Sequence, residues 1–260
     1  MNLKRLYTQP GKTVVTAHRG FSGSHPENTL TAFTKAVEAG VDIVEFDVRE
    51  TRDGRLVILH DATLDRTTDG SGPAEEKTGA ELKALNASFW AGPHDTGRRL
   101  ERPAGAERIP FLEEALSALA GRVGLNIQVY TASREALAKL VALYRAHGLE
   151  ESAFLMLGSF EQAVWVRALD PRVAVCVGER RDDLERHLAF GVDFMQPRKH
   201  QLTDDYLRRL RAEGVPFNVF YANTPADIVS LLERGVRGIM TDAPDVLFAT
   251  LRSHRGDRRE

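Results

Sequence analysis

Short apolar runs alternate along the chain with longer segments that carry apolar residues at helical spacing. Many of the helical segments end in a glycine, which readily takes the left-handed conformation that closes a helix; these glycines are Gly40, Gly121, Gly148, Gly191, Gly214 and Gly235. The alternation predicts βα units around a parallel sheet. The predicted strands are residues 13–17, 43–48, 56–59, 124–129, 154–157, 173–177, 194–196, 217–220 and 238–241.

The third predicted strand does not fit a simple succession of parallel strands. Only a short polar turn, Thr51-Arg52-Asp53-Gly54, separates it from the second strand, whereas a parallel crossover needs about a dozen residues or more. Residues 56–59 must therefore run antiparallel to the strand before them and return His60 to the mouth of a barrel. Eight parallel strands remain, which predicts an α/β fold, a (β/α)8 TIM barrel with a small insertion after the hairpin of the second barrel strand.

The length of 260 residues suits a single domain, 1–260, built on such a barrel. The segment 62–108 breaks the alternation, because it is rich in Gly, Thr, Pro and charged residues and has helical character only around 80–85. A long excursion on the catalytic face of a barrel is typical of a lid or a specificity element. We expect residues 253–260 to form a frayed, disordered tail.

The composition of the chain indicates which kinds of molecule it can bind. The net charge of −2 gives no basic surface for nucleic acid, so we expect a small-molecule partner. The N-terminal residues show no secretory pattern, and no apolar run approaches about eighteen residues, which predicts a cytoplasmic protein without stable membrane insertion. Cys176 is the only cysteine and lies in an apolar run, so we expect a buried thiol. The sequence leaves the oligomeric state open.

Chemically active side chains gather where the first predicted strands end. His18 and Arg19 follow the first strand, Glu45 and Asp47 belong to the second, and His60 follows the antiparallel return. Residues two apart on a strand face the same side, so Glu45 and Asp47 both point into the barrel mouth. Two carboxylates so close repel each other unless a cation lies between them, and oxygen-only ligands favour Mg²⁺ or Ca²⁺. The cluster is typical of metal-assisted phosphoryl transfer.

Several short motifs, in their order and spacing, resemble the glycerophosphodiester phosphodiesterase family over nearly the whole chain. The resemblance implies phosphodiesterase activity and a barrel with a small insertion after the His-Asp pair. The motifs are His18-Arg19-Gly20, Pro26-Glu27-Asn28-Thr29, Glu45-Phe46-Asp47-Val48, Thr51-Arg52-Asp53-Gly54, Val57-Ile58-Leu59-His60-Asp61, Thr63-Leu64-Asp65-Arg66-Thr67-Thr68, Ile109-Pro110-Phe111-Leu112-Glu113-Glu114-Ala115-Leu116, Ser159-Phe160 and Gly238-Ile239-Met240-Thr241-Asp242.

In such a site we expect the cation to hold a phosphodiester oxygen and the adjacent hydroxyl, with Arg19 as a second positive clamp on the phosphate. His18 and His60 share the proton transfers, one as base and the other as acid, and the sequence does not assign which is which. The resemblance implies that a neighbouring hydroxyl of the substrate is the nucleophile and that a cyclic phosphate forms before water opens it. Phe220 and Tyr221, where the family usually has a tryptophan, are predicted to form an aromatic wall against the substrate.

One stretch departs from the family pattern. After the third barrel strand the family typically carries a glutamate that binds the metal and, two residues later, a lysine near the phosphate. This chain has Gln128 and Tyr130 at those positions. Gln128 still offers a carbonyl oxygen as a metal ligand, and Tyr130 offers the substrate a hydroxyl. The pocket loses one negative and one positive charge together, so we expect phosphate binding to survive and metal affinity to fall.

Three functions fit these residues. The first is a phosphodiesterase that cleaves a glycerophosphodiester, or an opine-type sugar phosphodiester, to an alcohol and a phosphomonoester. The second is a lyase that stops at the cyclic phosphate, or a transferase that passes the phosphoryl group to another alcohol. The third is a non-catalytic phosphodiester-binding barrel, which the retention of both His18 and His60 disfavours.

The polar residues next to this cluster receive structural interpretations. Glu27 and Asn28 are expected to tie the first loop to its helix, which Asn28 or Thr29 can cap. Asp61 is expected to orient His60 or the backbone. The remaining histidines are interpreted as ordinary surface residues, two of which, His25 and His200, can lie near the mouth; the others are His94, His147 and His187.

Overall fold

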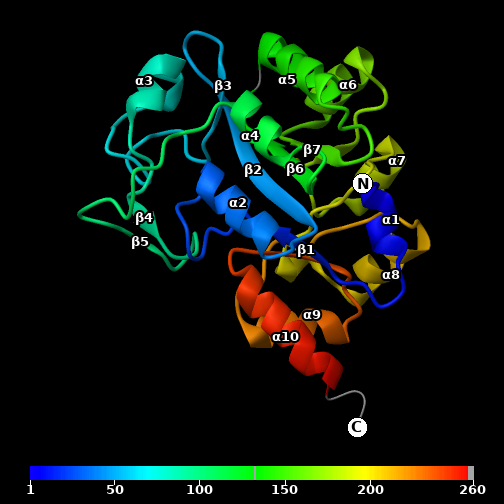
Figure 1. Ribbon diagram of the computed structural model, residues 1–260. Coiled ribbons are helices and arrows are strands. Elements are labelled where there is room, and N and C mark those ends of the chain that lie inside the picture. The colour runs from blue at the N-terminus through cyan, green and yellow to red at the C-terminus, as the bar shows by residue number, and fades with distance from the viewer. Residues whose placement is uncertain (132, 257–260) are drawn as a thin grey trace.

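A curled sheet of parallel strands forms the centre of the protein, and helices lie around its outer face (Figure 1). The structure is a computed structural model and describes residues 1–131 and 133–256. Adjacent strands follow the order β8-β7-β6-β2-β1-β9. Their bounds are β1 (Val14–Ala17), β2 (Ile43–Glu50), β6 (Gly124–Val129), β7 (Ala153–Leu157), β8 (Val175–Val177) and β9 (Gly238–Thr241).

Two short segments close this sheet into a barrel. The segment 193–198 joins β8 through hydrogen bonds from the backbone N–H groups of Asp193 and Phe194 to the carbonyl of Val175. The segment 217–220 then pairs with it and with β9 in parallel, through isolated bridges such as Val219 with Ile239. The predicted strands 194–196 and 217–220 are therefore part of the barrel, but they pair with their neighbours through isolated β-bridges and not through continuous β-ladders. The predicted (β/α)8 architecture is confirmed.

The predicted antiparallel return is also confirmed. Strand β3 (Leu56–Ile58) pairs antiparallel with the outer half of β2, with Val48 opposite Ile58 and Glu50 opposite Leu56. Strand β2 extends past the barrel to Glu50 before the turn. The return of the chain places His60 at the barrel mouth, where the carboxyl ends of the parallel strands meet.

The helices follow the predicted alternation. The six glycines expected to close helical segments all have positive φ, between 62° and 84°. Of the two candidate caps of the first barrel helix, Thr29 is the one that caps it, by accepting from the N–H of Ala32. The helices are α2 (Leu30–Glu38), α4 (Leu112–Leu119), α5 (Arg134–Ala146), α6 (Phe160–Leu169), α7 (Leu184–Phe190), α8 (Asp204–Ala212), α9 (Pro225–Glu233) and α10 (Pro244–Gly256), with a 3-10 turn η2 (Lys199–Gln201).

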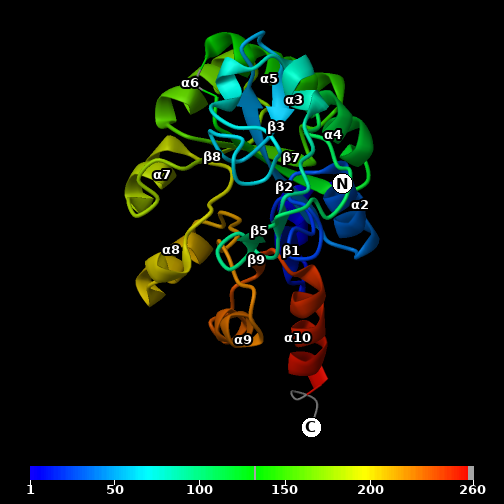
Figure 2. The same ribbon diagram turned by 90° about the vertical axis from the view of Figure 1, so that its left-hand side faces the viewer.

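The segment 62–108 forms a small unit on one side of the barrel (Figures 1 and 2). Its buried apolar residues, such as Leu64 and Leu82, pack in one cluster with Val57 of β3 and with Ile109. Its elements are η1 (Ala74–Glu76), α3 (Gly79–Ala84), and a hairpin of β4 (Trp90–Ala91) and β5 (Arg98–Arg99). None of the described helices has both the length and the apolar character needed to span a bilayer.

The predicted C-terminal tail needs a correction. Residues 253–256 continue α10, because the helical hydrogen-bond pattern runs on to Gly256. The rest of the predicted tail, 257–260, lies outside the described residues. The other end of the chain also forms a helix that the sequence patterns did not reveal, α1 (Leu3–Thr8).

Helix α1 packs against the barrel interior. Leu3 is buried in one apolar cluster with Val14, Ile43 and Phe154, which belong to three different barrel strands, and the expected buried thiol of Cys176 belongs to the same cluster. Gly124 makes room for this packing, since a Cβ at that position would lie 2.4 Å from Leu3 Cδ2. Leu3, together with the partly buried Leu6 and Tyr7 that pack against the same cluster, thus completes the barrel core.

We expect Leu3→Ala to lower the free energy of unfolding by about 2–5 kcal/mol, because it removes buried methyl groups and leaves a cavity. Urea denaturation measures the change. The matched control is Leu169→Ala, at a residue that is 48% exposed, which we expect to change stability by less than about 0.5 kcal/mol. Equal effects of the two variants would show that α1 does not complete the core.

Candidate active site

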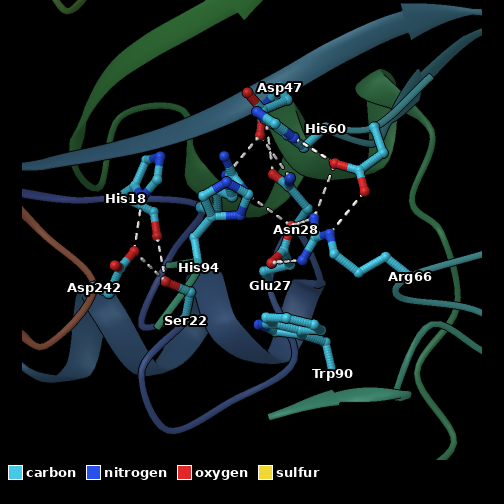
Figure 3. Close-up of polar contacts among 12 residues, drawn as sticks. His18, Ser22, Glu27, Asn28, Asp47, His60, Arg66, Trp90, His94 and Asp242 are labelled. Atoms are coloured by element: carbon cyan, nitrogen blue, oxygen red, sulfur yellow. Dashed lines mark hydrogen bonds and ion pairs between the residues drawn. The ribbon is translucent and has the colours of Figure 1, made fainter. Parts of the chain in front are cut away.

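The candidate residues converge at the mouth of the barrel from strands that are distant in sequence. Figure 3 shows His18, which follows β1, together with Asp47 from β2, His60 after β3 and Asp242 after β9. Because these strands are parallel neighbours or return to the same edge, their ends meet there. His18, His60 and Asp47 thus lie at the same end of the barrel.

His18 is buried and held by a carboxylate that the sequence patterns left without a role. Its Nδ1 donates to Asp242 Oδ1 over 2.6 Å. Asp242 also accepts from the Ser22 hydroxyl (2.9 Å) and from the Asn223 amide (2.7 Å). Burial raises the pKa of Asp242, but the His18 ring and these hydrogen bonds outweigh it and keep that pKa well below its usual range. The contact fixes the His18 ring and leaves Nε2 for other partners.

The His60 ring is also held by a carboxylate. Its Nδ1 donates to Asp61 Oδ1 over 2.6 Å, so Asp61 orients this ring as expected. Arg66 donates to both oxygens of Asp61, with Nε at 2.7 Å from Oδ2. Despite partial burial, which acts in the opposite direction, the His60 and Arg66 contacts lower the pKa of Asp61 far below its ordinary value. Arg49 also donates to the backbone carbonyl of His60, from both Nε and Nη2.

Arg19 lies beneath the cavity and is enclosed by carboxylates. Its Nη1 donates to Glu27 over 2.9 Å and its Nε lies 3.2 Å from Asp47. Its backbone N–H donates to Glu45 Oε2 over 2.8 Å. Burial lowers the pKa of Arg19, but Asp47, Glu27 and Glu45 together raise it above its ordinary value. With an exposure of 1%, the guanidinium acts on the cavity from below and not from its surface.

The charged groups form one continuous chain across the mouth. Arg66 pairs with Glu27 through two hydrogen bonds of 2.7 Å, and Glu27 pairs with Arg19 in turn. Because Arg66 also holds Asp61, acid and base alternate from Asp47 to Asp61. Positive charge on both sides overcomes the burial of Glu27 and lowers its pKa to about 2. Glu27 and Asn28 are thus structural, as predicted, and Asn28 donates to Asp47 over 2.7 Å.

Glu45 and Asp47 are both buried and lie two residues apart on β2, so their side chains leave the strand on the same face. Each has one oxygen engaged, while Glu45 Oε1 and Asp47 Oδ1 are buried without a hydrogen-bond partner among the described residues. Burial first, and then the neighbouring charge of Asp47, raise the pKa of Glu45 well above its ordinary value. Two unsatisfied carboxylate oxygens side by side are the donor set that a hard divalent cation takes, so these residues fit a metal ion.

The third predicted metal ligand differs in kind from the first two. Gln128 is the partner of Asp47 in the β2–β6 register, and its Nε2 donates to the Tyr130 hydroxyl over 2.5 Å, which turns its carbonyl oxygen away from Tyr130. Within residues 1–131 and 133–256, no group of three or more His, Cys, Asp or Glu side chains is arranged to hold a metal ion. The candidate metal ligands at this place are therefore two carboxylates and one amide.

Aromatic rings line the cavity on two sides. Phe220 meets the His18 ring edge-on at 5.1 Å between centroids, and Tyr221 stacks on it at 5.8 Å. Tyr130 meets the His60 ring edge-on at 5.3 Å, and the Arg49 guanidinium lies 4.6 Å above the Tyr130 centroid. Each candidate acid–base ring is therefore packed against aromatic carbon as well as bonded to a carboxylate.

His94 is a site residue that was expected at the surface. It lies in the turn between β4 and β5, and its ring centroid is 6.5 Å from that of His18 and 5.1 Å from that of His60 (Figure 3). The sequence carried no signal for it, because the insertion has no periodicity that orients a loop. His187 was also expected at the surface, yet it is buried, with both ring nitrogens bonded to backbone carbonyls.

A parallel barrel with these candidate acid–base and metal-binding residues at its mouth fits the class of (β/α)8-barrel enzymes whose site lies at the carboxyl ends of the strands. Comparison with known families narrows the class. The model of the Glycerophosphoryl diester phosphodiesterase family matches residues 18–246. The chain belongs to this family, and it is accordingly a phosphoric diester hydrolase.

Individual relatives agree with this membership over almost their whole length. The chain is 31% identical to the glycerophosphodiester phosphodiesterase of Caldanaerobacter subterraneus subsp. tengcongensis over 251 residues, which is 93% of this chain and 98% of that protein. An Oleispira antarctica phosphodiesterase, solved in complex with the product sn-glycerol-3-phosphate, superposes with a TM-score of 0.77 at 26% identity and covers 92% and 96% of the two chains. A structure from Silicibacter pomeroyi supports the fold, with a TM-score of 0.83, 23% identity and 95% of both chains covered.

We expect Arg66→Met to lower the free energy of unfolding by about 2–4 kcal/mol, because it leaves Glu27 and Asp61 without their shared cation in a largely buried place. Urea denaturation measures the loss. Arg52→Met is the matched control, since the Arg52 side chain is 60% exposed and has a single 3.4 Å contact with Glu81; we expect a change below about 0.5 kcal/mol. A loss for Arg66→Met no larger than for the control would contradict the charge chain.

Proposed function

We propose that this protein hydrolyses glycerophosphodiesters to an alcohol and sn-glycerol 3-phosphate. The observation that carries the proposal is the pair of imidazoles at one mouth, each with Nδ1 bonded to a carboxylate at 2.6 Å. Such contacts hold one ring nitrogen and leave Nε2 to exchange protons with a substrate. The product bound by the Oleispira antarctica relative supports the choice of substrate class.

In the proposed reaction His18 and His60 are the catalytic acid and base. One ring takes the proton of the substrate's neighbouring hydroxyl, whose oxygen attacks phosphorus, while the other ring gives a proton to the departing alcohol oxygen. The product of this step is a cyclic phosphate, which water opens with the two proton transfers reversed. Asp242 and Asp61 stabilise whichever ring carries the proton.

Glu45, Asp47 and Gln128 are proposed to hold Mg²⁺ or Ca²⁺. When bound, such an ion offsets negative charge on the phosphoryl oxygens and lowers the barrier to attack. The proposal is supported by the two unpartnered carboxylate oxygens of Glu45 and Asp47. The aromatic rings of Tyr130, Phe220 and Tyr221 are proposed to contact the organic part of the substrate.

We expect His18→Ala and His60→Ala each to reduce turnover of glycerophosphocholine by about 10²–10⁴-fold, because each removes one proton transfer. Release of sn-glycerol 3-phosphate gives the rate, and phosphorus NMR identifies the product as monoester or cyclic phosphate. His147→Ala, at the C-terminal end of α5, serves as the control and should keep the wild-type rate. Undiminished turnover in either site variant refutes the assignment. Accumulation of the cyclic phosphate makes the protein a lyase, and cleavage of sugar phosphodiesters alone makes opine-type compounds the substrate.

We expect Gln128→Glu to tighten Ca²⁺ binding by about tenfold or more, since a carboxylate is a stronger ligand than an amide for a hard cation. Isothermal titration calorimetry of the apoprotein measures the affinity directly. Gln9→Glu adds the same charge at an exposed residue at the end of α1, on the amino-terminal side of β1 and so opposite the mouth, and should leave the affinity unchanged. Equal affinities of wild type and Gln128→Glu would exclude Gln128 from the ligand set.

A further inference from the structure

The Arg19 guanidinium is almost fully buried, and its Nε and Nη1 face Asp47, Glu27 and His94. Glu27 and His94 occupy both hydrogens of Nη1, so a phosphate oxygen would have to displace one of them to reach that nitrogen. Nη2 forms no hydrogen bond with any of the described residues. One of the two partners of Nη1 is thus the imidazole of His94.

The contact between these two residues fixes the protonation pattern of the imidazole. Arg19 Nη1 lies 2.9 Å from His94 Nδ1. A guanidinium can only donate, so Nδ1 accepts and carries no proton. The single proton of the neutral ring must then be on Nε2. Burial, and after it the charge of Arg19, lower the pKa of His94 to about 4, in agreement with a neutral ring.

The His94 ring lies next to both candidate acid–base histidines, with centroids 6.5 Å from that of His18 and 5.1 Å from that of His60. The two nitrogens of an imidazole lie on separate edges, so Nε2 points away from Arg19. Among the described residues, none forms a hydrogen bond with His94 Nε2. The ring therefore offers a donor N–H without a protein partner beside the two candidate acid–base rings.

We propose that His94 is a substrate-binding residue that donates from Nε2–H to a non-bridging oxygen of the phosphodiester and transmits the positive charge of Arg19 to it. This inference rests on the proposed function. A cation bonded to one edge of an imidazole polarises the ring and strengthens the N–H on the other edge. His94 thus extends the clamping charge of Arg19 to the phosphate, and it does so without competing in the proton transfers of His18 and His60.

The placement of His94 also assigns a function to the insertion 62–108, which is to hold this ring at the site. The hairpin that carries His94 begins with Trp90, and the Arg66 guanidinium lies 4.8 Å above the Trp90 ring. Arg66 is bonded to Glu27, which is bonded to Arg19. The hairpin is therefore tied to the barrel through the same charge chain that supports Arg19, and this chain sets the position of the His94 ring.

Three variants of His94 distinguish the contact of its Nδ1 with Arg19 from the proposed contact of its Nε2 with the substrate. His94→Ala removes both contacts, His94→Asn keeps an acceptor near Arg19, and His94→Gln places an amide donor near the position of Nε2. We expect KM for glycerophosphocholine and the inhibition constant of sn-glycerol 3-phosphate to rise about tenfold or more for His94→Ala and His94→Asn. His94→Gln should recover most of the loss. His147→Ala, at the C-terminal end of α5, is the control and should match wild type.

A second measurement does not depend on turnover. ¹⁵N NMR of histidine-labelled protein reports the tautomer of each ring, and we expect His94 to be the Nε2–H tautomer at pH 7, with its Nε2 signal shifting on addition of sn-glycerol 3-phosphate. An Nδ1–H tautomer or an imidazolium at pH 7 overturns the proposal. So does a KM for His94→Ala equal to or below that of wild type, which would make the ring an obstacle to substrate. Failure of wild type to cleave glycerophosphocholine, with an intact product-induced shift at His94, would refute the proposed function and leave this contact standing.

Discussion

The buried guanidinium of Arg19 is the interaction on which the mouth of the barrel depends. It is held by Glu27 and Asp47 through its side chain, and its backbone N–H holds Glu45. A buried cation among acids is stable only while each charge keeps its partner. Without the Arg19 side chain, Glu27 would keep Arg66 and Asp47 would keep Asn28, but the cation that joins these two acids would be lost. Arg19 therefore ties Glu27 to Asp47 through its side chain and positions Glu45 through its backbone N–H.

The same interaction explains why the acids remain only half satisfied. Arg19 and Asn28 engage one oxygen each of Glu45 and Asp47 and leave the neighbouring oxygens without partners. A fully paired cluster would be a structural salt-bridge network and nothing more. The two remaining oxygens, which are buried without a partner among the described residues, carry the charge that would attract the proposed divalent ion.

Much of this arrangement could be predicted from the sequence, because it follows from local rules. A turn too short for a crossover required β3 to reverse, and the spacing of Glu45 and Asp47 on one strand required them to share a face. The contacts that could not be predicted join residues distant in sequence. Asp242 meets His18 only because the barrel closes β9 against β1, and no local pattern orients the loop that carries His94. The helical pattern of the six residues 3–8 is too short to distinguish from a disordered start, so the packing of Leu3 under the barrel was missed.

The central claim is that Arg19 holds Glu45 and Asp47 so that their free oxygens form a cation site. A crystal structure with Ca²⁺ and sn-glycerol 3-phosphate tests it most directly. We predict one ion within about 2.3–2.6 Å of Glu45 Oε1 and Asp47 Oδ1, with Arg19 still bonded to Glu27. An ion bound elsewhere, or these two oxygens left without one at saturating Ca²⁺, would contradict it.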